Sequence, residues 1–338
     1  VLSVVKADAY GHGMLEVVRV LEREGGRFFA VSNLEEGITL RKAGCKHRIL
    51  LLEATLPEMA RALVEHDLTP SLSSPALVKE LDRYGRKYKK KISVHVKVDT
   101  GMGRLGVWHK DVPAFLREVS QFDHVHIEGL FTHFPVADTN RAFTEKQVED
   151  FSRVVVELIK EQVPFTYLHA ANSMGIGACK NRLFNLVRPG LALYGLYPAE
   201  AFRRLVSLKP VMAVKARVLL LKTIHHGRGI SYGHTFRARR DLPVAVVSIG
   251  YSDGYFRACS NRAFVLVNGT RCQVVGRVTM DQIVVDVSKA GRVRAGDEVV
   301  LVGKQGKGEI TAEDVAQWAG TINYEVVCNL GNRLSHIY

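Results

Sequence analysis

The chain has 338 residues, of which 47% are hydrophobic and 24% are charged, and its formal net charge is +13. This composition is typical of a soluble globular protein, and the length predicts one large domain with a smaller one. No apolar run is long enough to span a membrane, and no signal peptide is visible. Because the chain opens inside a predicted strand, we expect that an N-terminal segment is missing from it.

The positive charge is spread along the chain, with one dense run at Arg86–Lys91 near the end of a predicted helix. Such a run is typical of a solvated helix face. A nucleic-acid partner would rest on charge alone, because no helix-turn-helix, zinc-finger or RNP pattern is present. The cysteines are scattered and form no C-x-x-C pair, which indicates a reduced cytoplasmic protein; they are Cys45, Cys179, Cys259, Cys272 and Cys328.

Strand-like and helix-like segments alternate through the first two thirds of the chain. About eight strands separated by amphipathic helices predict a (β/α)8 barrel over residues 1–208. An open doubly wound sheet is the alternative, but the G-x-G-x-x-G pattern it favours is absent after the first strand. The predicted strands are Val1–Lys6, Phe28–Ser32, Arg48–Glu53, Thr69–Ser73, Ile92–Asp99, Val125–His133, Thr166–Ala170 and Asn185–Arg188.

Residues 209–338 have a different texture, with short valine-rich runs separated by turn residues such as Asn268-Gly269. This pattern predicts a mainly antiparallel β domain. One helix is predicted at Thr311–Gly320, since Thr311-Ala-Glu-Asp314 is a capping signature. The predicted strands are Val211–Leu221, Val244–Ile249, Ala263–Val267, Gln273–Val278, Ile283–Val287 and Glu298–Val302.

Lys6 ends the first valine-rich strand, and Gly11 and Gly13 follow it before a helix. A lysine at the mouth of a buried strand suits an amine that loses its proton and attacks a carbonyl, because desolvation favours the neutral form. A lysine whose stem lies along the strand while its ammonium reaches water explains the pattern equally well.

Further polar residues fall near the predicted C-terminal strand ends, where a barrel enzyme carries its chemistry. On the strand Ile92–Asp99, His95, Lys97 and Asp99 share one face, so an inward Lys97 would need a partner such as Asp99. The residues near strand ends are Lys6, Arg104, His133, Asn172, Ser173 and Arg188.

Asn172 and Ser173 are predicted to be an N-cap pair that opens a short helix, a place where phosphate can bind. Gly190 would let backbone approach a phosphate closely. Capping alone is the plainer interpretation of the pair. The pair His124-x-His126 lies at the beginning of its strand, so a structural role is favoured over a metal site.

Several stretches together resemble the alanine racemases, which use pyridoxal phosphate (PLP), and the resemblance covers nearly the whole chain. It implies a PLP-dependent racemase that interconverts L-alanine and D-alanine for peptidoglycan, as a homodimer with shared active sites. The stretches are Val5-Lys-Ala-Asp-Ala-Tyr-Gly-His-Gly13, Val98-Asp-Thr-Gly-Met-Gly-Arg-Leu-Gly106, Val187-Arg-Pro-Gly-Leu-Ala-Leu-Tyr-Gly195, Ile230-Ser-Tyr-Gly233 and Gly276-Arg-Val-Thr-Met-Asp-Gln282.

The resemblance also implies roles in the barrel. Lys6 forms the Schiff base with PLP and later moves a proton. Arg104 donates to the phenolic oxygen of the cofactor and is oriented by Lys97, as an amine or a carbamate. Arg188 faces the pyridine nitrogen and is supported by His169. The remaining cofactor residues are His133 near the ring, Asn172, and Tyr10, Ser173, Gly190 and Tyr324 around the phosphate.

For the β domain the resemblance implies that Tyr232 is the second catalytic base and reaches into the neighbouring subunit. Tyr251, Met280 and Asp281 would line the path of the substrate from the partner chain. Serine or broad-specificity racemisation remains an alternative, since one hydroxyl is hard to exclude from such a pocket. A PLP decarboxylase of the same fold and a barrel-only PLP-binding protein fit less well. The glycine triplet expected of such a decarboxylase is absent from this sequence. A barrel-only protein has no β domain, whereas this chain is predicted to have one.

Overall fold

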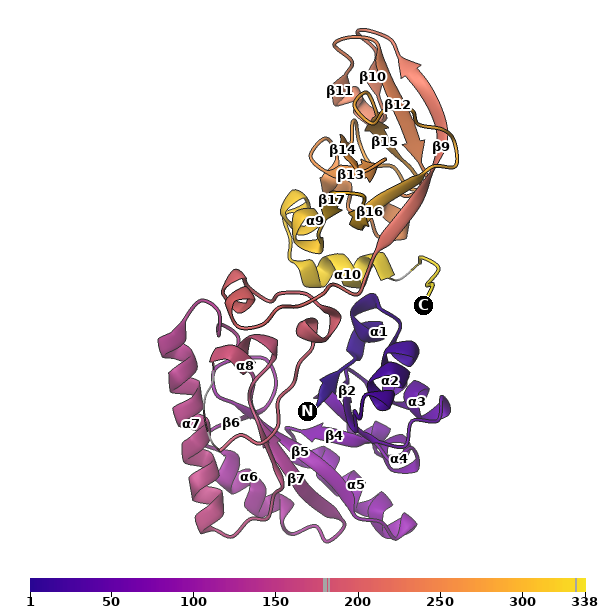
Figure 1. Ribbon diagram of the computed structural model, residues 1–338. Coiled ribbons are helices and arrows are strands. Elements are labelled where there is room, and N and C mark those ends of the chain that lie inside the picture. The colour runs from indigo at the N-terminus through magenta and orange to yellow at the C-terminus, as the bar shows by residue number, and fades with distance from the viewer. Residues whose placement is uncertain (179–180, 182, 332) are drawn as a thin grey trace. The chain divides into compact units, whose positions relative to one another are not determined.

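The computed structural model describes residues 1–178, 181, 183–331 and 333–338, and the chain forms two compact units. The first unit comprises Val1–Ala9, Met14–Leu193 and Tyr197–Leu208. The second comprises Tyr10–Gly13, Tyr194–Leu196 and Lys209–Tyr338. Figure 1 shows the elements of both units, the first built of alternating strands and helices and the second mainly of strands. Cys179 lies outside the described residues.

The strands of the first unit are parallel and follow one another around a curled sheet in the order β1-β2-β3-β4-β5-β7-β8. They read as nearly continuous apolar runs because helices cover the outside of the sheet. The predicted parallel barrel is confirmed. The strands are β1 (Ser3–Val4), β2 (Phe28–Val31), β3 (Arg48–Ala54), β4 (Thr69–Leu72), β5 (Ile92–Asp99), β7 (Val125–Phe131) and β8 (Tyr167–His169), with β6 (Val107–Trp108) paired to β5.

Residues 185–189 close the barrel without forming a regular strand. The amide of Leu2 donates to the carbonyl of Val187 over 2.9 Å, and the amide of Arg188 donates to the carbonyl of Ala171 over 2.8 Å. The segment therefore lies in the place of the eighth strand, between β8 and β1. The prediction of a regular strand here was wrong. The backbone hydrogen bonds of this segment form only isolated contacts, and Pro189 has no amide hydrogen to donate.

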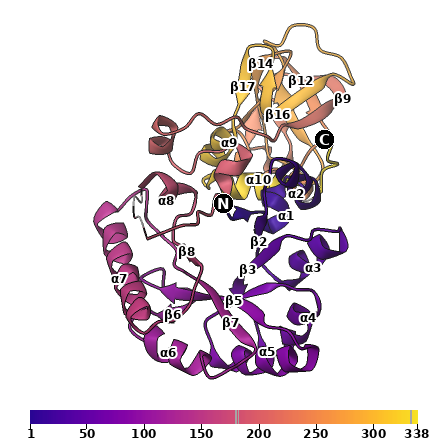
Figure 2. The ribbon, with the colours of Figure 1, turned by 60° about the horizontal axis from the view of Figure 1, so that its bottom comes forward.

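Helices α2 to α7 form a ring outside the strands, as Figure 2 shows. The helix α7 illustrates why: its buried residues include Phe151, Val154, Val155 and Leu158, at the spacing that puts side chains on one helix face. The helices are α2 (Met14–Arg23), α3 (Leu34–Lys42), α4 (Ala60–Glu65), α5 (Pro75–Tyr88), α6 (Val112–Val119), α7 (Arg141–Lys160) and α8 (Ser173–Ala178).

The second unit is built on an antiparallel sheet with the strand order β14-β13-β16-β9-β12-β15, which confirms the predicted class. A two-stranded ribbon, β10 and β11, accompanies it, and β17 pairs with β16. The strands are β9 (Val214–Ile224), β10 (Gly229–Ile230), β11 (Phe236–Arg237), β12 (Leu242–Val247), β13 (Phe264–Val267), β14 (Thr270–Gln273), β15 (Ile283–Asp286), β16 (Glu298–Gln305) and β17 (Gly308–Ile310).

The turn Asn268-Gly269 sets the register of the hairpin β13–β14. Both residues have positive φ, 51° and 74°, as a tight two-residue hairpin requires. The partner strand therefore begins directly at Thr270, and the prediction of a strand over Gln273–Val278 was wrong.

The helix α9 (Ala312–Ala319) begins as predicted. Thr311 accepts from the amide of Asp314 over 3.0 Å, and the carboxylate of Asp314 accepts from the amide of Thr311 over 2.9 Å. The helix α10 (Asn323–Gly331) was not predicted. Among the described residues, no helix combines the length and the apolar character needed to cross a bilayer.

Candidate functional site

Lys6 lies where the backbone leaves β1 in a left-handed turn, α1 (Lys6–Gly11). Four successive residues that are not glycine, 7 to 10, have φ between 51° and 55°. This conformation costs about 1–2 kcal/mol for each L-residue, so the surrounding structure must hold it. Strained backbone of this kind is typical of functional sites. The sequence carries no local signal for it.

Two carboxylates hold this turn. Glu36, in the first turn of α3, accepts from the amide of Ala7 over 2.6 Å and from the amide of Ser32 over 2.7 Å. Asp8 accepts from the amide of Met14 over 2.7 Å. These charge-assisted hydrogen bonds fix the backbone next to Lys6. Glu36 was missed by sequence reasoning, because its motif lies on another element.

Arg188 is a buried cation held by neutral acceptors. Its side chain donates to Nδ1 of His169 over 2.9 Å and to the carbonyls of Thr132 and Ala170 over 2.7 and 3.0 Å. Burial lowers the pKa of Arg188 to about 9. No carboxylate in the described part of the chain pairs with it, so its charge is available to a ligand. The predicted support by His169 is present.

Lys97 points from β5 into the barrel and is only 6% exposed. Its ammonium lies 5.5 Å from the centroid of the Phe131 ring. Asp99, the partner considered from the sequence, instead accepts from the amides of Gly101 and Gly103 over 2.8 and 3.2 Å. Lys97 and Asp99 form no ion pair.

The loop after β5 carries Arg104 to the end of the strand. Its bend depends on Gly103, whose φ of 67° is a conformation that other residues adopt only with strain. The hydrogen bonds from this loop to Asp99 fix the same bend. The glycines and the aspartate of this motif thus fix the backbone position of Arg104.

The cations of this region act on one another. Burial and the charges of Arg104, Arg188 and Lys6 lower the pKa of Lys97 to about 8. Burial and the charges of Arg188, Lys97, Arg104 and Lys6 lower the pKa of His133 to about 3, so its imidazole is neutral. Among the described residues, no carboxylate lies within ion-pair distance of these four cations.

Two of these cations, Lys97 and Arg188, are buried, and buried positive charge of this kind is unfavourable unless an anion binds there. PLP fits the donor set, because its phosphate and its phenolic oxygen are both anionic. The lowered pKa of Lys97 also means that this lysine gives up its proton more readily than an isolated lysine does.

Asn172 and Ser173, which the sequence predicted to cap a helix together, have different partners in the structure. Asn172 caps α8, since its Oδ1 accepts from the amide of Gly175 over 2.9 Å. The hydroxyl of Ser173 instead accepts from the amides of Gly190 and Ala192 over 3.0 and 3.4 Å. The prediction of Ser173 as a cap was wrong. Because Oγ of Ser173 accepts these two bonds, its own proton remains available for a ligand such as a phosphate.

Within the second unit, Tyr10 and Tyr324 lie together, with ring centroids 6.2 Å apart. Tyr194 packs against Tyr10 at 5.1 Å and stacks on His12 at 4.6 Å. Burial and the neighbouring phenol of Tyr324 raise the pKa of Tyr10 well above its ordinary value. Tyr10 is therefore a neutral phenol that can donate a hydrogen bond.

The structure also brings together three residues predicted to line the substrate path. The amide of Tyr251 donates to the carbonyl of Thr279 over 2.9 Å. The hydroxyl of Ser252 donates to the carbonyl of Met280 over 2.7 Å and to the carboxylate of Asp281 over 3.0 Å. The side chains of Tyr251 and Met280 are exposed.

Tyr232 stands out from a strained turn of the second unit and is 71% exposed. The flanking residues Ser231 and Gly233 have positive φ, 60° and 68°. The hydroxyl of Ser231 donates to the carbonyl of Arg277 over 2.7 Å, which anchors the turn. An exposed aromatic on a fixed, strained turn suits a residue whose partner lies outside its own chain.

Comparisons with known proteins match both units. The profile "Alanine racemase, N-terminal domain" matches residues 1–198, and "Alanine racemase, C-terminal domain" matches residues 211–338. The alanine racemases of Halothermothrix orenii and Carboxydothermus hydrogenoformans are each 42% identical over 339 residues. These alignments cover 100% of this chain and 89% and 92% of the relatives.

Solved structures agree with this result. Alanine racemase of Clostridium difficile 630 has a TM-score of 0.90 at 36% identity and covers 97% of this chain and 86% of its own. Alanine racemase from Bartonella henselae, with covalently bound pyridoxal phosphate, has a TM-score of 0.89 at 32% identity. That alignment covers 100% of this chain and 92% of the other.

Proposed function

This chain belongs to the alanine racemase family, and from that premise we propose that it interconverts L-alanine and D-alanine with two acid–bases, Lys6 and Tyr232. The observation that carries the proposal is the pair of buried cations Lys97 and Arg188, which has no acidic partner among the described residues. Its natural complement is an anionic cofactor, and PLP is the one the family uses.

The barrel residues divide the binding of PLP between them. Lys6 would hold it covalently through Nζ, Arg188 would donate toward its pyridine nitrogen, and Arg104 would donate toward its phenolic oxygen. Ser173, Gly190, Tyr10 and Tyr324 would bind its phosphate, His133 would pack near the ring, and Asn172 would be a further cofactor residue. Once bound, PLP supplies the electron sink that makes the Cα proton of the amino acid acidic.

Inversion requires that a proton leaves one face of Cα and returns to the other, and one residue on each face is the simplest arrangement. Nζ of Lys6 exchanges the proton of the D-isomer. Oη of Tyr232 exchanges that of the L-isomer. Because arginine rarely gives up its proton, Arg188 keeps the pyridine nitrogen unprotonated, which moderates the electron sink and limits side reactions.

Tyr232 acts in the site of a second copy of the chain, so the active unit is a homodimer with two-fold symmetry. Tyr251, Met280 and Asp281 line the path of the substrate in the same partner site. Their exposure in a single copy supports this arrangement. The enzyme acts in the cytoplasm, where D-alanine is needed for peptidoglycan synthesis.

Lys97 orients Arg104 and is a candidate for carbamylation. The ammonium loses one proton, and the neutral amine then adds to the carbon of CO2 and releases a second, which converts a cation facing three cations into an anion. A lysine whose pKa is about 8 has a larger neutral fraction at neutral pH than an ordinary lysine. The carbamate oxygens would accept hydrogen bonds from Arg104.

Racemisation assays on the purified PLP-loaded protein test the proposed function. L-alanine and L-serine are compared at equal concentration, with D-isomer formation as the measurement. Faster formation of D-alanine is the expected result. A preference for serine would replace the substrate assignment, and CO2 release without inversion would favour a decarboxylase and overturn the proposal.

A further inference from the structure

A continuous row of buried polar side chains crosses the barrel from Arg188 to Arg48. Arg188 lies 2.9 Å from Nδ1 of His169, and Nε2 of His169 lies 2.8 Å from Nδ1 of His95. Nε2 of His95 faces a carboxylate oxygen of Glu128 at 3.4 Å, and the other oxygen of Glu128 faces Nε of Arg48 at 3.1 Å. We call these five residues the relay.

The imidazoles of the relay are enclosed. His95 and His169 are 0% exposed, and the ring of Phe131 stacks on His169 with centroids 4.8 Å apart. A Cβ atom on Gly129 would lie 2.7 Å from the ring of His95, so glycine is what leaves space for that ring. Neither ring can turn to find other partners without disturbing the core.

Arginine at one end favours one direction for the hydrogen bonds of the relay, and that direction is completed only where an acceptor faces Nε2 of His95. A guanidinium only donates, so Nδ1 of His169 must accept. Burial lowers the pKa of both imidazoles, so each is neutral and carries one proton. Nε2 of His169 then donates to Nδ1 of His95, and Nε2 of His95 carries the proton that faces Glu128.

Glu128 is the acceptor in which the relay ends. Burial would raise its pKa, but the contact with His95 and the charge of Arg48 hold its pKa below the ordinary value. Nε2 of His95 and the facing oxygen of Glu128 have no hydrogen-bond partner among the described residues, and they lie 3.4 Å apart. The contact between them is therefore the main interaction available to each atom.

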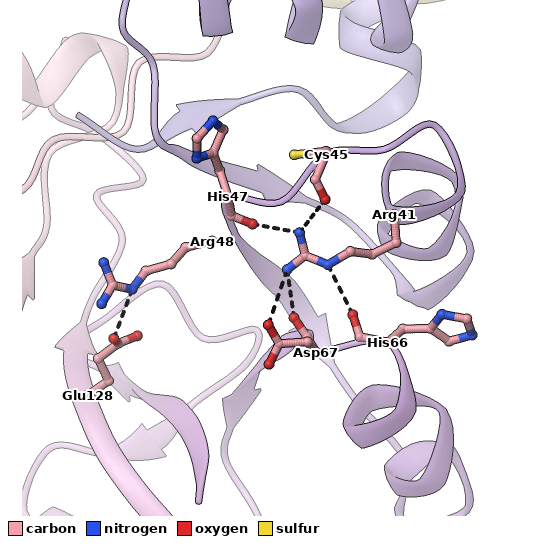
Figure 3. A network of polar contacts seen from close by, with 7 residues as sticks. All are labelled: Arg41, Cys45, His47, Arg48, His66, Asp67 and Glu128. Carbon is pink, nitrogen blue, oxygen red and sulfur yellow. Dashed lines mark hydrogen bonds and ion pairs between the residues drawn. The ribbon is translucent and has the colours of Figure 1, made fainter. Parts of the chain in front are cut away.

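The opposite oxygen of Glu128 meets Arg48, whose side chain is half exposed, as Figure 3 shows. Both residues line a cavity of about 180 Å³, and Arg41 and Lys91 also line it. In Figure 3, Arg41 is occupied separately, with contacts to Cys45, His47, His66 and Asp67. Arg48 is thus the cation that orients Glu128 from the cavity side.

We propose that Glu128 is a positioning residue: through His95 it holds both imidazoles with the proton on Nε2, and so keeps Nδ1 of His169 ready to accept from Arg188. The consequence for the cofactor rests on the proposed function, because it requires that Arg188 face the pyridine nitrogen. The tautomers themselves do not depend on it.

Both oxygens of the carboxylate are needed. An amide at position 128 has one oxygen, which can accept from Arg48 or from His95 but not from both. If the oxygen turns to Arg48, the amide nitrogen meets the N–H of His95, and two donors face each other. Relief of that clash moves the proton of His95 to Nδ1, which in turn moves the proton of His169 to Nδ1 and opposes Arg188.

The direct test is long-range ¹H–¹⁵N NMR on the PLP-loaded protein labelled in histidine, at neutral pH, with single substitutions for assignment. The expected result is that His95 and His169 both carry the proton on Nε2. A proton on Nδ1 of either residue, or a charged imidazole, would overturn the proposal. This readout needs no activity, so a failure here is distinct from a failure of the proposed function.

The variant Glu128→Gln is compared with Glu128→Asp, which keeps a carboxylate, and with Glu161→Gln, which changes a surface carboxylate paired with Arg117. In Glu128→Gln we expect the histidine tautomers to switch, the absorption spectrum of bound PLP to shift, and kcat to fall about tenfold. Glu128→Asp should keep the tautomers and recover part of kcat, and Glu161→Gln should match the original protein.

The variants also separate a positioning role from a structural one. A loss of kcat in Glu128→Gln with unchanged tautomers and an unchanged PLP spectrum would contradict the proposal. If Glu128→Gln does not fold, a proton on Nδ1 of His95 or His169 in the original protein or in Glu128→Asp still overturns the proposal.

Discussion

Arg188 donates to Nδ1 of His169 across 2.9 Å, and both side chains are buried among the strands of the barrel. The hydrogen bond to His169 holds the guanidinium of Arg188 in place as a donor, and no carboxylate among the described residues pairs with its charge. The geometry explains why a neutral histidine accompanies the arginine: an imidazolium there would add a charge where burial and Arg188 already lower the pKa of His169.

Replacement of Arg188 by lysine should weaken both stability and catalysis. Lysine keeps the charge but cannot reach His169 and the carbonyls of Thr132 and Ala170 together. We expect a loss of about 1–3 kcal/mol in unfolding free energy, from buried acceptors left unpaired. We also expect kcat/KM to fall by about 10- to 100-fold, equivalent to about 1.4–2.8 kcal/mol. Denaturant unfolding and steady-state racemisation measure the two effects.

Arg203→Lys is the matched control, since Arg203 pairs with Glu200 at the surface. Full activity in Arg188→Lys would show that the guanidinium geometry is not needed.

Lys97 should make the stability of the cofactor-free protein depend on pH. Its pKa is about 8 in the fold and 10.5 ordinarily. Between these values the unfolded chain binds more protons, so stability rises with pH, and below about 8 the full penalty remains. The difference corresponds to about 3 kcal/mol. Lys97→Met should therefore be the more stable protein at neutral pH, and its advantage should shrink as the pH approaches 10.5.

Urea unfolding at several pH values checks this, with Lys79→Met on the exposed face of α5 as the control. An advantage of Lys97→Met that does not change with pH would mean that packing, rather than the charge, is responsible.

Ser173→Ala should weaken PLP binding more than it weakens the fold. The hydroxyl of Ser173 accepts from the amides of Gly190 and Ala192, and its removal takes away one donor to the phosphate. We expect Kd for PLP to rise about tenfold, equivalent to about 1.4 kcal/mol. Titration followed by absorbance gives Kd, and Ser120→Ala, which removes a surface hydroxyl bonded to Leu116, is the control.

Unchanged affinity for PLP in Ser173→Ala would place the phosphate elsewhere.

Mixed dimers test whether Tyr232 acts in the partner site. Chains with Lys6→Ala and chains with Tyr232→Phe should each have little activity alone. When co-assembled, half-sites from the two variants combine to form one complete site per dimer, and activity should return to at most about half of the original per dimer. Persistent inactivity, with dimer formation checked by gel filtration, would count against a shared site.

The sequence predicted the alternation of strands and helices and the β domain because both depend on local periodicity. The resemblance also implied that His169 supports Arg188, and the two side chains are hydrogen-bonded. The sequence could not show the left-handed turn after Lys6, because Glu36 holds that turn from another helix. It assigned Ser173 to a helix cap, since the amide of Gly190 that claims its hydroxyl lies 17 residues away.

Sequence reasoning also left Glu128 unremarked. Its importance follows from contacts across the barrel between β7 and β5, which no local pattern encodes. The same holds for the segment 185–189 that closes the barrel, because its hydrogen-bond partners on β1 lie at the beginning of the chain.

Deuterium transfer in heavy water tests the two-base account most directly. The PLP-loaded protein is incubated with L-alanine, and deuterium at Cα is measured in both isomers early in the reaction. We predict D-alanine that carries deuterium at Cα, and a Tyr232→Phe variant that no longer inverts L-alanine. D-alanine that retains the original proton would instead mean that one group moves the proton between both faces, and would contradict the assignment of Lys6 and Tyr232.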